Sequence, residues 1–347
     1  MAASAAGLVE RIEALRIPAQ PQAAAHDWKD WYHVVLLHPA SGWRVIANLN
    51  LAGGGPDAQL QWTLVVHRPG GACGVSLHGA SRSQPWHAGM VTARPLHIAG
   101  DEAVFGFDGE CITLRIAPRD LDLQLSLHAA PAATPLLVTD GAPFGSGFIG
   151  WGLLARMRAE GQIAVCGETA PIGDAWFCYH DHNFGRFRWG EDFGWEWLVA
   201  HITCEGEVVT VVVDWRCDRA HASGGLPYLF VLAGGALRKV FLGPAMRLRW
   251  SWNDAAQLPP RLPGAMATRL ADLPVRTPRA ITLDAADERD RITLTVAVDA
   301  YLEIVAPDNR GSAFARIGES SGAAALELRL GGRRLEGRGL AYAEYTQ

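Results

Sequence analysis

The residues best suited to chemistry lie in one aromatic-rich stretch, residues 176–197. It places two histidines, an aspartate, an asparagine, a tyrosine and a glutamate between large aromatics: Tyr179, His180, Asp181, His182, Asn183 and Glu196. Burying ionisable groups among aromatics costs free energy unless the groups are paired. Because such groups gather at functional sites more often than elsewhere, this stretch is the candidate site, and we expect the rest of the chain to position it.

Alternation predicts how these side chains are shared between two faces. If residues 177–183 form a strand, successive side chains point to opposite sides of it. One face then carries Tyr179, Asp181 and Asn183, and the other carries His180 and His182. A second strand over 193–202 places Trp195 and Trp197 together, opposite Glu196, and a third follows over 208–215. Five of the 13 tryptophans lie in this region, which predicts an aromatic wall beside a polar cluster: Trp176, Trp189, Trp195, Trp197 and Trp215.

Acid–base catalysis on an apolar substrate is the first chemistry that fits these residues. Burial would favour the protonated form of Asp181 and leave a proton to donate. Trp195 and Trp197 would stabilise a developing carbocation by cation–π attraction, while His180 or His182 would orient the acid or relay protons. The remaining polar side chains would position water or a polar group of the substrate: Glu196, Tyr179 and Asn183.

Two alternatives stay open at this point. His180 and His182 at strand spacing can reach one metal ion, with Glu196 or His201 as a further ligand. Because no third ligand is identified, we predict neither a metal nor an organic cofactor. In the other alternative, the polar groups satisfy one another and brace a barrel without doing chemistry.

Composition and charge exclude several classes of protein. The net charge is −5 and no basic run occurs, which argues against nucleic acid as a partner. No apolar run approaches the roughly 20 residues that span a bilayer, and residues 1–25 lack a secretion signal. Scattered cysteines without a C-x-x-C pair predict reduced thiols: Cys73, Cys111, Cys166, Cys178, Cys204 and Cys217. We expect a soluble, cytoplasmic protein for which peripheral membrane contact stays open, and we predict no oligomeric state.

Periodicity predicts an all-β protein with a short N-terminal helix. Apolar residues recur at helical spacing from Ala5 to Leu15 and then, from Trp28 onward, at every second position, as in Leu121–Leu127 and Leu326–Leu330. Glycine pairs at the turns predict antiparallel sheets, closed into barrels or stacked as sandwiches. A length of 347 residues predicts two domains. We place a helix and linker at 1–26, one domain at 27–218 and the other at 219–347.

The segment from Gly145 to Gly150 matches G-x-G-x-x-G, the fingerprint of dinucleotide-binding folds. That fingerprint requires a preceding strand, a following helix and a parallel βαβ unit. Pro143 interrupts the approach, and the surrounding pattern is that of short antiparallel strands. We therefore do not predict nucleotide binding.

The motif of residues 179–185, Y-H-D-H-N-F-G, together with Trp195-Glu196-Trp197 resembles the signature of a known superfamily. This is the hydroxyneurosporene synthase (carotenoid 1,2-hydratase) superfamily, which includes AttH-like proteins and lipocalin-like Diels–Alderases. Residues 337–346, which contain Glu344, look like its closing G-x-G-x-x-x-x-E strand. The resemblance extends over residues 27–347. It implies two lipocalin-like β domains with a ligand cavity in or between them.

These observations lead to one hypothesis and two alternatives. The hypothesis is an enzyme for an apolar unsaturated small molecule, an isoprenoid or polyketide, that carries out acid-catalysed hydration or cyclisation of a carbon–carbon double bond. Its catalytic residues would be Asp181, His180, His182 and Glu196, and its substrate-binding residues Tyr179, Asn183, Trp195, Trp197 and Glu344. The alternatives are a pericyclase that depends on cavity shape, and a lipocalin-like carrier that binds an apolar ligand without converting it.

Overall fold

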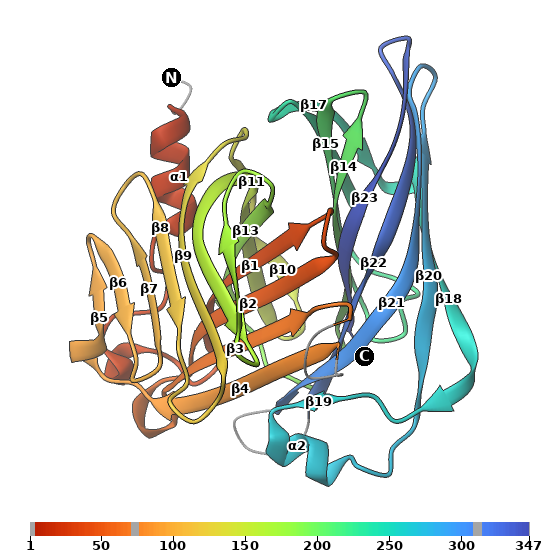
Figure 1. Ribbon diagram of the computed structural model, residues 1–347. Helices are drawn as coiled ribbons and strands as arrows, with labels where there is room; N and C mark the ends of the chain where they lie inside the picture. The colour runs from red at the N-terminus through yellow and green to blue at the C-terminus, as the bar shows by residue number, and fades with distance from the viewer. Residues whose placement is uncertain (1–3, 71–75, 308–313, 347) are drawn as a thin grey trace. The chain divides into compact units, whose positions relative to one another are not determined.

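The chain folds into two compact units, each built on one large sheet. The structure, a computed structural model, describes residues 4–70, 76–307 and 314–346. Contacts divide the chain into Met1–Arg188 and Trp189–Gln347. The strands pair antiparallel throughout except for the short β19, which pairs parallel with β21 (Figure 1). The predicted all-β, two-domain fold with a short N-terminal helix is therefore confirmed.

The first unit contains helix α1, a 13-stranded sheet and three short 3-10 helices. Its elements are α1 (Ala5–Glu13), β1 (Trp28–His38), β2 (Trp43–Ala52), β3 (Gln59–His67), β4 (Leu77–Pro85), β5 (Val91–Ala93), β6 (Leu96–Ala99), β7 (Ala103–Phe107), β8 (Ile112–Ile116), β9 (Leu123–Pro131), β10 (Leu136–Phe144), β11 (Gly147–Val165), β12 (Glu168–Ile172) and β13 (Phe177–Arg186).

The order of strands places β13 in the interior of the first sheet. The order is β4-β3-β2-β1-β13-β11-β9-β8-β7-β6-β5, and β10 and β12 each pair with β11. Most of β1, β2 and β13 is buried on both faces. The alternating apolar residues of the outer strands, such as Leu123, Leu125 and Leu127, enter one hydrophobic core. The candidate strand is thus held by hydrogen bonds along both edges.

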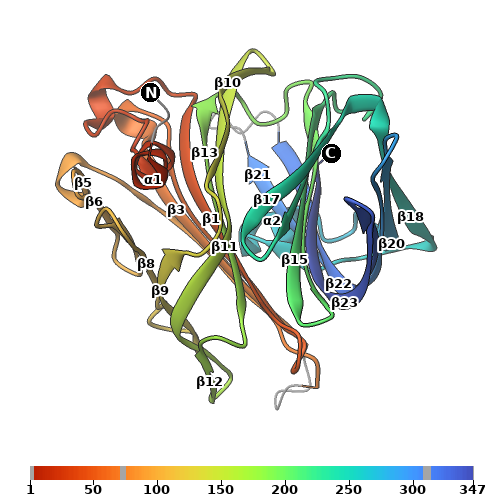
Figure 2. The ribbon, with the colours of Figure 1, turned by 90° about the horizontal axis from the view of Figure 1, so that it is seen from above.

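Helix α1 packs within the first unit. Seen from above, it lies inside the curve of the sheet (Figure 2). Ser4 caps its N-terminus by accepting a hydrogen bond from the backbone N–H of Gly7 at 3.1 Å. Its apolar face, which includes Val9 and Ile12, joins the core of the sheet. The sequence analysis predicted this helix but assigned it no function.

The second unit contains a 10-stranded sheet that encloses its own core. Its elements are β14 (Gly194–Cys204), β15 (Glu207–Cys217), β16 (Tyr228–Ala233), β17 (Ala236–Leu242), β18 (Met246–Gln257), β19 (Arg261–Leu262), α2 (Gly264–Arg269), β20 (Val275–Ala286), β21 (Arg291–Pro307), β22 (Phe314–Leu330) and β23 (Arg333–Thr346). The order is β17-β16-β15-β14-β23-β22-β21-β20-β18, with β19 beside β21.

The division between the units differs from the boundary expected from sequence. We had placed that boundary after residue 218, but β14 and β15 pair within the second sheet. Residues 218–225 form a loop that is held to the end of β15 by a bridge between Cys217 and Gly224. The partner of β14 is β23, the last strand of the chain, and local sequence does not reveal a pairing over that separation.

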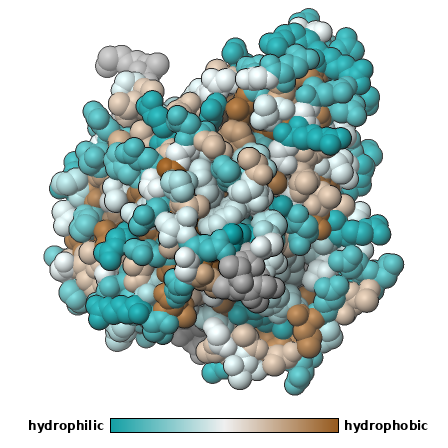
Figure 3. Space-filling model, in the orientation of Figure 1, coloured by the Kyte–Doolittle hydropathy of each residue, from teal (hydrophilic) through white to brown (hydrophobic). Residues whose placement is uncertain are grey.

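Two further expectations can be compared with the structure. Cys166 is disulfide-bonded, so the prediction that all thiols are reduced is wrong for this residue. Cys111, Cys178, Cys204 and Cys217 are free thiols. Within the described parts of the chain, neither helix has the length and apolar character needed to cross a bilayer. On the face drawn in Figure 3, polar residues predominate and apolar ones occur in small groups.

The glycines of the G-x-G-x-x-G segment serve packing in an antiparallel hairpin. Residues 145–150 span the turn between β10 and β11 and the start of β11. A Cβ on Gly147 would lie 1.8 Å from the carbonyl oxygen of Arg186, and one on Gly150 would lie 2.1 Å from the ring of Phe184. No helix follows the segment, so the structure excludes a dinucleotide-binding fingerprint at these residues.

The close approach of β23 to β14 gives a test of the second sheet. A Cβ on Gly339 would lie 1.9 Å from the backbone carbonyl oxygen of His201, which cannot move without disturbing the strand pair. We expect Gly339→Ala to lower the free energy of unfolding by about 3 kcal/mol, measured by urea denaturation. Gly264→Ala is the control, because a Cβ there meets nothing within 4 Å. Equal stability of the two variants would contradict the described pairing of β14 and β23.

Candidate functional site

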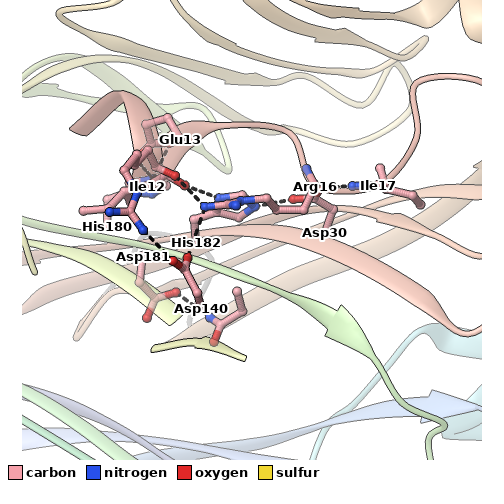
Figure 4. A network of polar contacts seen from close by, with 11 residues as sticks. Ile12, Glu13, Arg16, Ile17, Asp30, Asp140, His180, Asp181 and His182 are labelled. Carbon is pink, nitrogen blue, oxygen red and sulfur yellow. Dashed lines mark hydrogen bonds and ion pairs between the residues drawn. The ribbon is translucent and has the colours of Figure 1, made fainter. Parts of the chain in front are cut away.

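Strand β13 presents polar side chains on both faces, and both faces are buried. Asp181 lies opposite His33 of β1 and Leu153 of β11 in the strand register. Close up, the Asp181 carboxyl points away from His180 and His182, to the other side of the strand (Figure 4). The alternation predicted for residues 177–183 is confirmed. The site therefore consists of two separate polar clusters, one on each face.

The first cluster surrounds the carboxyl group of Asp181. Its Oδ2 accepts hydrogen bonds from the hydroxyl of Tyr179 at 2.7 Å and from the indole N–H of Trp151 at 3.2 Å. Its Oδ1 accepts one from the side-chain amide of Asn183 at 2.8 Å. All four side chains are buried. The structure thus brings together three predicted site residues and adds Trp151, which the sequence analysis missed.

This arrangement determines which form of the carboxyl group is stabilised. Trp151 can only donate, and Asn183 donates through its amide, so both favour negative charge on Asp181. The hydroxyl of Tyr179 can donate to a carboxylate or accept from a carboxylic acid. The carboxyl group of Asp181 therefore has only uncharged partners in this cluster, and one of them, Tyr179, can either donate or accept. A group that serves as acid and then as base needs both its protonated and its ionised state.

The second cluster begins with His182, which makes two hydrogen bonds. Nδ1 lies 2.5 Å from the carbonyl oxygen of Ile12, and Nε2 contacts Oδ1 of Asp30. The other oxygen of Asp30 accepts the backbone N–H groups of Arg16 and Ile17, at 2.5 and 2.7 Å. Every partner of the imidazole ring is an acceptor, so the ring satisfies both only as an imidazolium.

The pKa of His182 reflects these contacts. Burial alone would lower it, but the charges of Asp30 and Glu13 and the hydrogen bonds to Asp30 and to the Ile12 carbonyl outweigh burial, so the pKa is raised above 6.5. The ring of Tyr32 stacks on the imidazole with centroids 4.2 Å apart. Burial, followed by the charges of Asp30 and Glu13, raises the pKa of Tyr32 well above 10.0, which keeps the phenol neutral.

His180 forms a second pair with a carboxyl group. Its Nδ1 lies 2.9 Å from the carbonyl oxygen of His33, so Nδ1 carries a hydrogen. Its Nε2 lies 3.0 and 3.1 Å from the two oxygens of Glu13. Without a hydrogen between them, lone pairs would face one another. The contact between Nε2 of His180 and Glu13 is therefore a hydrogen bond, and both side chains are completely buried.

Glu13 and Asp30 were missed by the sequence analysis. Glu13 ends α1, a helix interpreted as a capping arm, and Asp30 lies in the apolar strand β1. Gly152 of β11 explains how α1 comes so close, because a Cβ there would lie 2.8 Å from Cγ1 of Ile12. The sequence contained one indication of these partners. Two histidines in a strand that is expected to be buried require partners, and acids elsewhere in the chain can supply them.

A cleft of about 440 Å³ opens beside this second cluster. Its walls come from α1, the hairpin of β5 and β6, and the turn after β7. Glu13 contributes to its floor, although its side chain exposes no surface.

In the second unit, Glu196 belongs to a cluster that braces the end of the sheet. Its two oxygens contact Nδ1 of His221 and the indole N–H of Trp250, each at 3.0 Å. Nε2 of His221 contacts the carbonyl oxygen of Thr346 at 2.7 Å. Cys217 lies 3.4 Å from the same Nδ1. Burial, then the charges of nearby acids, raises the pKa of this thiol to about 12, so it remains protonated and is not a nucleophile at neutral pH.

Glu344 lies on the other face of the second sheet, with a buried acid beside it. Its Oε2 accepts the indole N–H of Trp195 at 2.7 Å. Glu319 lies directly opposite Glu344 in the register of β22 and β23. Burial, followed by the charge of Glu344, raises the pKa of Glu319 well above 4.5. Burial thus favours the protonated form of Glu319, and no sequence pattern distinguished this residue.

The structure does not bring the residues considered for a metal to one point. His180 and His182 bond to different carboxylates, and His201 contacts the hydroxyl of Thr210 at 3.0 Å. In residues 4–70, 76–307 and 314–346, no group of three or more His, Cys, Asp or Glu is arranged to hold an ion. All the roles in catalysis and substrate binding that the sequence predicts remain predictions, for Asp181, His180, His182, Glu196, Tyr179, Asn183, Trp195, Trp197 and Glu344 alike.

The raised pKa of His182 predicts a pH dependence of stability. A histidine whose folded-state pKa lies above the unfolded value of 6.5 contributes fully below pH 6.5, and its contribution is lost as pH rises through the folded-state pKa. His182→Gln leaves Asp30 without its charged partner and should lower the free energy of unfolding by about 3 kcal/mol at pH 6. The difference in the free energy of unfolding between wild type and variant should shrink as pH rises. Urea denaturation between pH 6 and 9 measures this difference.

His128→Gln is the control for this experiment, because its side chain is about half exposed. It should change stability by less than about 0.5 kcal/mol at every pH. A deficit in His182→Gln that stays constant or grows with pH would show that His182 is neutral in the folded protein.

Comparisons with known proteins support the fold. No family model matches the chain, and no curated protein sequence matches it. Three similar solved structures are an AttH candidate from Nitrosomonas europaea (16% identity, TM-score 0.62), kievitone hydratase from Nectria haematococca (12%, 0.58) and CghA with Sch210972 (10%, 0.55). Each alignment covers 96% of this chain, and 96%, 94% and 94% of the respective partner. At these identities the likeness concerns the fold, which the chain shares over almost its entire length with these proteins.

Proposed function

We propose that this protein is an enzyme that hydrates or cyclises an apolar unsaturated small molecule, such as an isoprenoid or a polyketide. The observation that carries the proposal is the carboxyl of Asp181, buried and held by neutral donors from Tyr179, Asn183 and Trp151. Such a carboxyl can exchange a proton without first breaking an ion pair. Kievitone hydratase and CghA, whose structure was solved with Sch210972, are similar to this chain in fold, which supports this class of activity.

The proposed reaction begins with protonation of a double bond. The O–H bond of Asp181 breaks, a C–H bond forms, and a carbocation remains opposite the new carboxylate. In hydration, water attacks the cation and returns a proton to Asp181. In cyclisation, a second double bond of the substrate attacks, and loss of a proton to Asp181 completes the step. Both reactions are redox-neutral and regenerate the acid, so the chemistry requires no organic cofactor.

The neighbours of Asp181 have distinct parts in this scheme. Trp151 and Asn183 stabilise the carboxylate that protonation leaves behind, which lowers the barrier to giving up the proton. Tyr179 donates its hydroxyl hydrogen to Oδ2 of Asp181 and so orients the carboxyl group. His180 and His182 lie across the strand from Asp181, so they act by fixing β13 and α1, and a proton could reach Asp181 from them only by a route around the sheet.

The substrate-binding roles expected for residues of the second unit form a separate part of the proposal, and the step at Asp181 does not depend on them. Trp195 and Trp197 would shape an apolar pocket and stabilise positive charge through their rings. Glu344 holds Trp195 in place through its indole N–H, and Glu196 would position water or a polar group of the substrate. Glu319 is a second candidate acid, because it is buried and its pKa is raised well above 4.5 by that burial and by the charge of Glu344.

Isotope incorporation distinguishes these assignments. Purified protein is incubated with farnesol, a linear isoprenoid with three double bonds, or with a linear polyene polyketide, in deuterium oxide. Hydration adds the mass of one heavy water, and cyclisation by protonation exchanges carbon-bound hydrogen for deuterium. We expect Asp181→Asn, which preserves shape but not acidity, to lower the rate by about 100-fold or more. Tyr179→Phe should cause a smaller loss.

Two control variants interpret the result. Asp122→Asn changes an exposed aspartate of the same unit and should leave the rate unchanged. Loss of turnover in Glu319→Gln with normal turnover in Asp181→Asn would assign the acid to Glu319. Turnover without deuterium uptake that survives both substitutions would show that the enzyme is a pericyclase and would disprove acid catalysis.

A further inference from the structure

A pocket of about 530 Å³ lies in the second unit, beside the loop that carries His221. Its walls are the end of β15, the loop 222–227 and the start of β18. Small-molecule sites commonly have volumes between about 300 and 1,000 Å³ and are mostly apolar with a few polar groups. The apolar part of this pocket comes from Trp215, Leu226, Met246 and Leu248.

The loop that forms one wall is held in place before any ligand arrives. Asp218 accepts the backbone N–H groups of Ala222 and Ser223 at 2.9 and 3.0 Å. The indole N–H of Trp215 donates to the carbonyl oxygen of Gly225 at 3.0 Å. A pocket whose walls are already fixed loses little conformational entropy when it binds.

Apolar side chains remain exposed at this end of the unit. Leu226 is 59% exposed and lines the pocket, and Leu242, at the end of β17 just before the lining residue Gly243, is 47% exposed. Covering such side chains with an alkyl chain removes apolar surface from water, at roughly 25 cal/mol per Å². The pocket can therefore bind an apolar chain of limited length.

Positive charge lies at the edge of the same pocket. Arg247 and Arg249 line both the pocket and an adjoining cleft of about 460 Å³, where Arg291 joins them. Asp284 is the acid that lines this cleft, and it pairs with Arg249 at 2.5 Å. Three arginines against one aspartate leave local positive charge in a chain whose net charge is −5. Arg247 is exposed and makes no ion pair in the described residues.

We propose that this pocket binds a single-chain amphipathic carboxylate, of the kind of a medium-chain fatty acid. The alkyl chain would pack against Trp215, Leu226 and Met246. The carboxylate would lie at the edge, where Arg247 and Arg249 offer charge-assisted hydrogen bonds. This site is independent of the acid–base step proposed at Asp181.

Isothermal titration calorimetry with sodium decanoate and with 1-decanol tests the assignment. Decanoate should bind one-to-one, more tightly than the alcohol and less tightly as salt is added. The double variant Arg247→Gln/Arg249→Gln should weaken decanoate binding about tenfold and leave decanol binding unchanged. Leu226→Asp should weaken both ligands. Circular dichroism checks that each variant is folded.

Two matched controls separate this site from the rest of the molecule. Arg329→Gln removes an exposed arginine from β22 in the same unit and should bind decanoate as the wild type does. Asp181→Asn should also bind normally, so failure of the catalytic proposal leaves this one intact. Absence of decanoate binding, or binding that ignores the double arginine variant, would overturn the proposal. Sedimentation with phosphatidylglycerol vesicles without binding of free decanoate would assign the patch to a membrane surface instead.

Discussion

Strand β13 places hydrogen-bonding side chains on both of its buried faces, and each of them must find a partner inside the protein. Leaving one buried polar group without a partner costs about as much free energy of folding as several good apolar contacts contribute. The first unit meets this constraint differently on the two sides of the sheet. Asp181 is surrounded by neutral donors, while His180 and His182 are each paired with a carboxyl group. The two faces can therefore have different functions.

The pairing of the histidines explains the position of the N-terminal segment. Glu13, the Ile12 carbonyl and the backbone N–H groups of Arg16 and Ile17 all take part in the same network. Because every one of these groups comes from residues 12–17, the segment cannot detach without leaving charges buried and unpaired. Helix α1 is thus held by polar contacts as well as by its apolar face, and the glycine at position 152 provides the space for it.

Periodicity and the local motif were sufficient for a large part of this structure. The alternation of residues 177–183 predicted the two faces of β13, and the apolar repeats predicted antiparallel sheets and the N-terminal helix. The partners of the histidines could not be predicted in this way, since Glu13 and Asp30 reach them through tertiary packing over more than 150 positions. The boundary between the units was misplaced for the same reason, because β14 pairs with β23, the last strand of the chain. Glu319 was missed because an acid between Gly318 and Ser320 looks like a surface residue until its burial is known.

The neutral surroundings of Asp181 set it apart from the paired acids Asp30 and Glu13. An acid fixed in an ion pair is a poor proton donor to an alkene, whereas an acid among neutral donors can change its charge at a site that already stabilises both states. This contrast is the basis for assigning chemistry to the Asp181 face of the strand. A crystal structure with a small molecule that the protein converts tests it most directly. The account predicts an unsaturated carbon of that molecule in contact with the carboxyl of Asp181, and a ligand bound elsewhere, with Asp181 still enclosed by its protein partners, would contradict it.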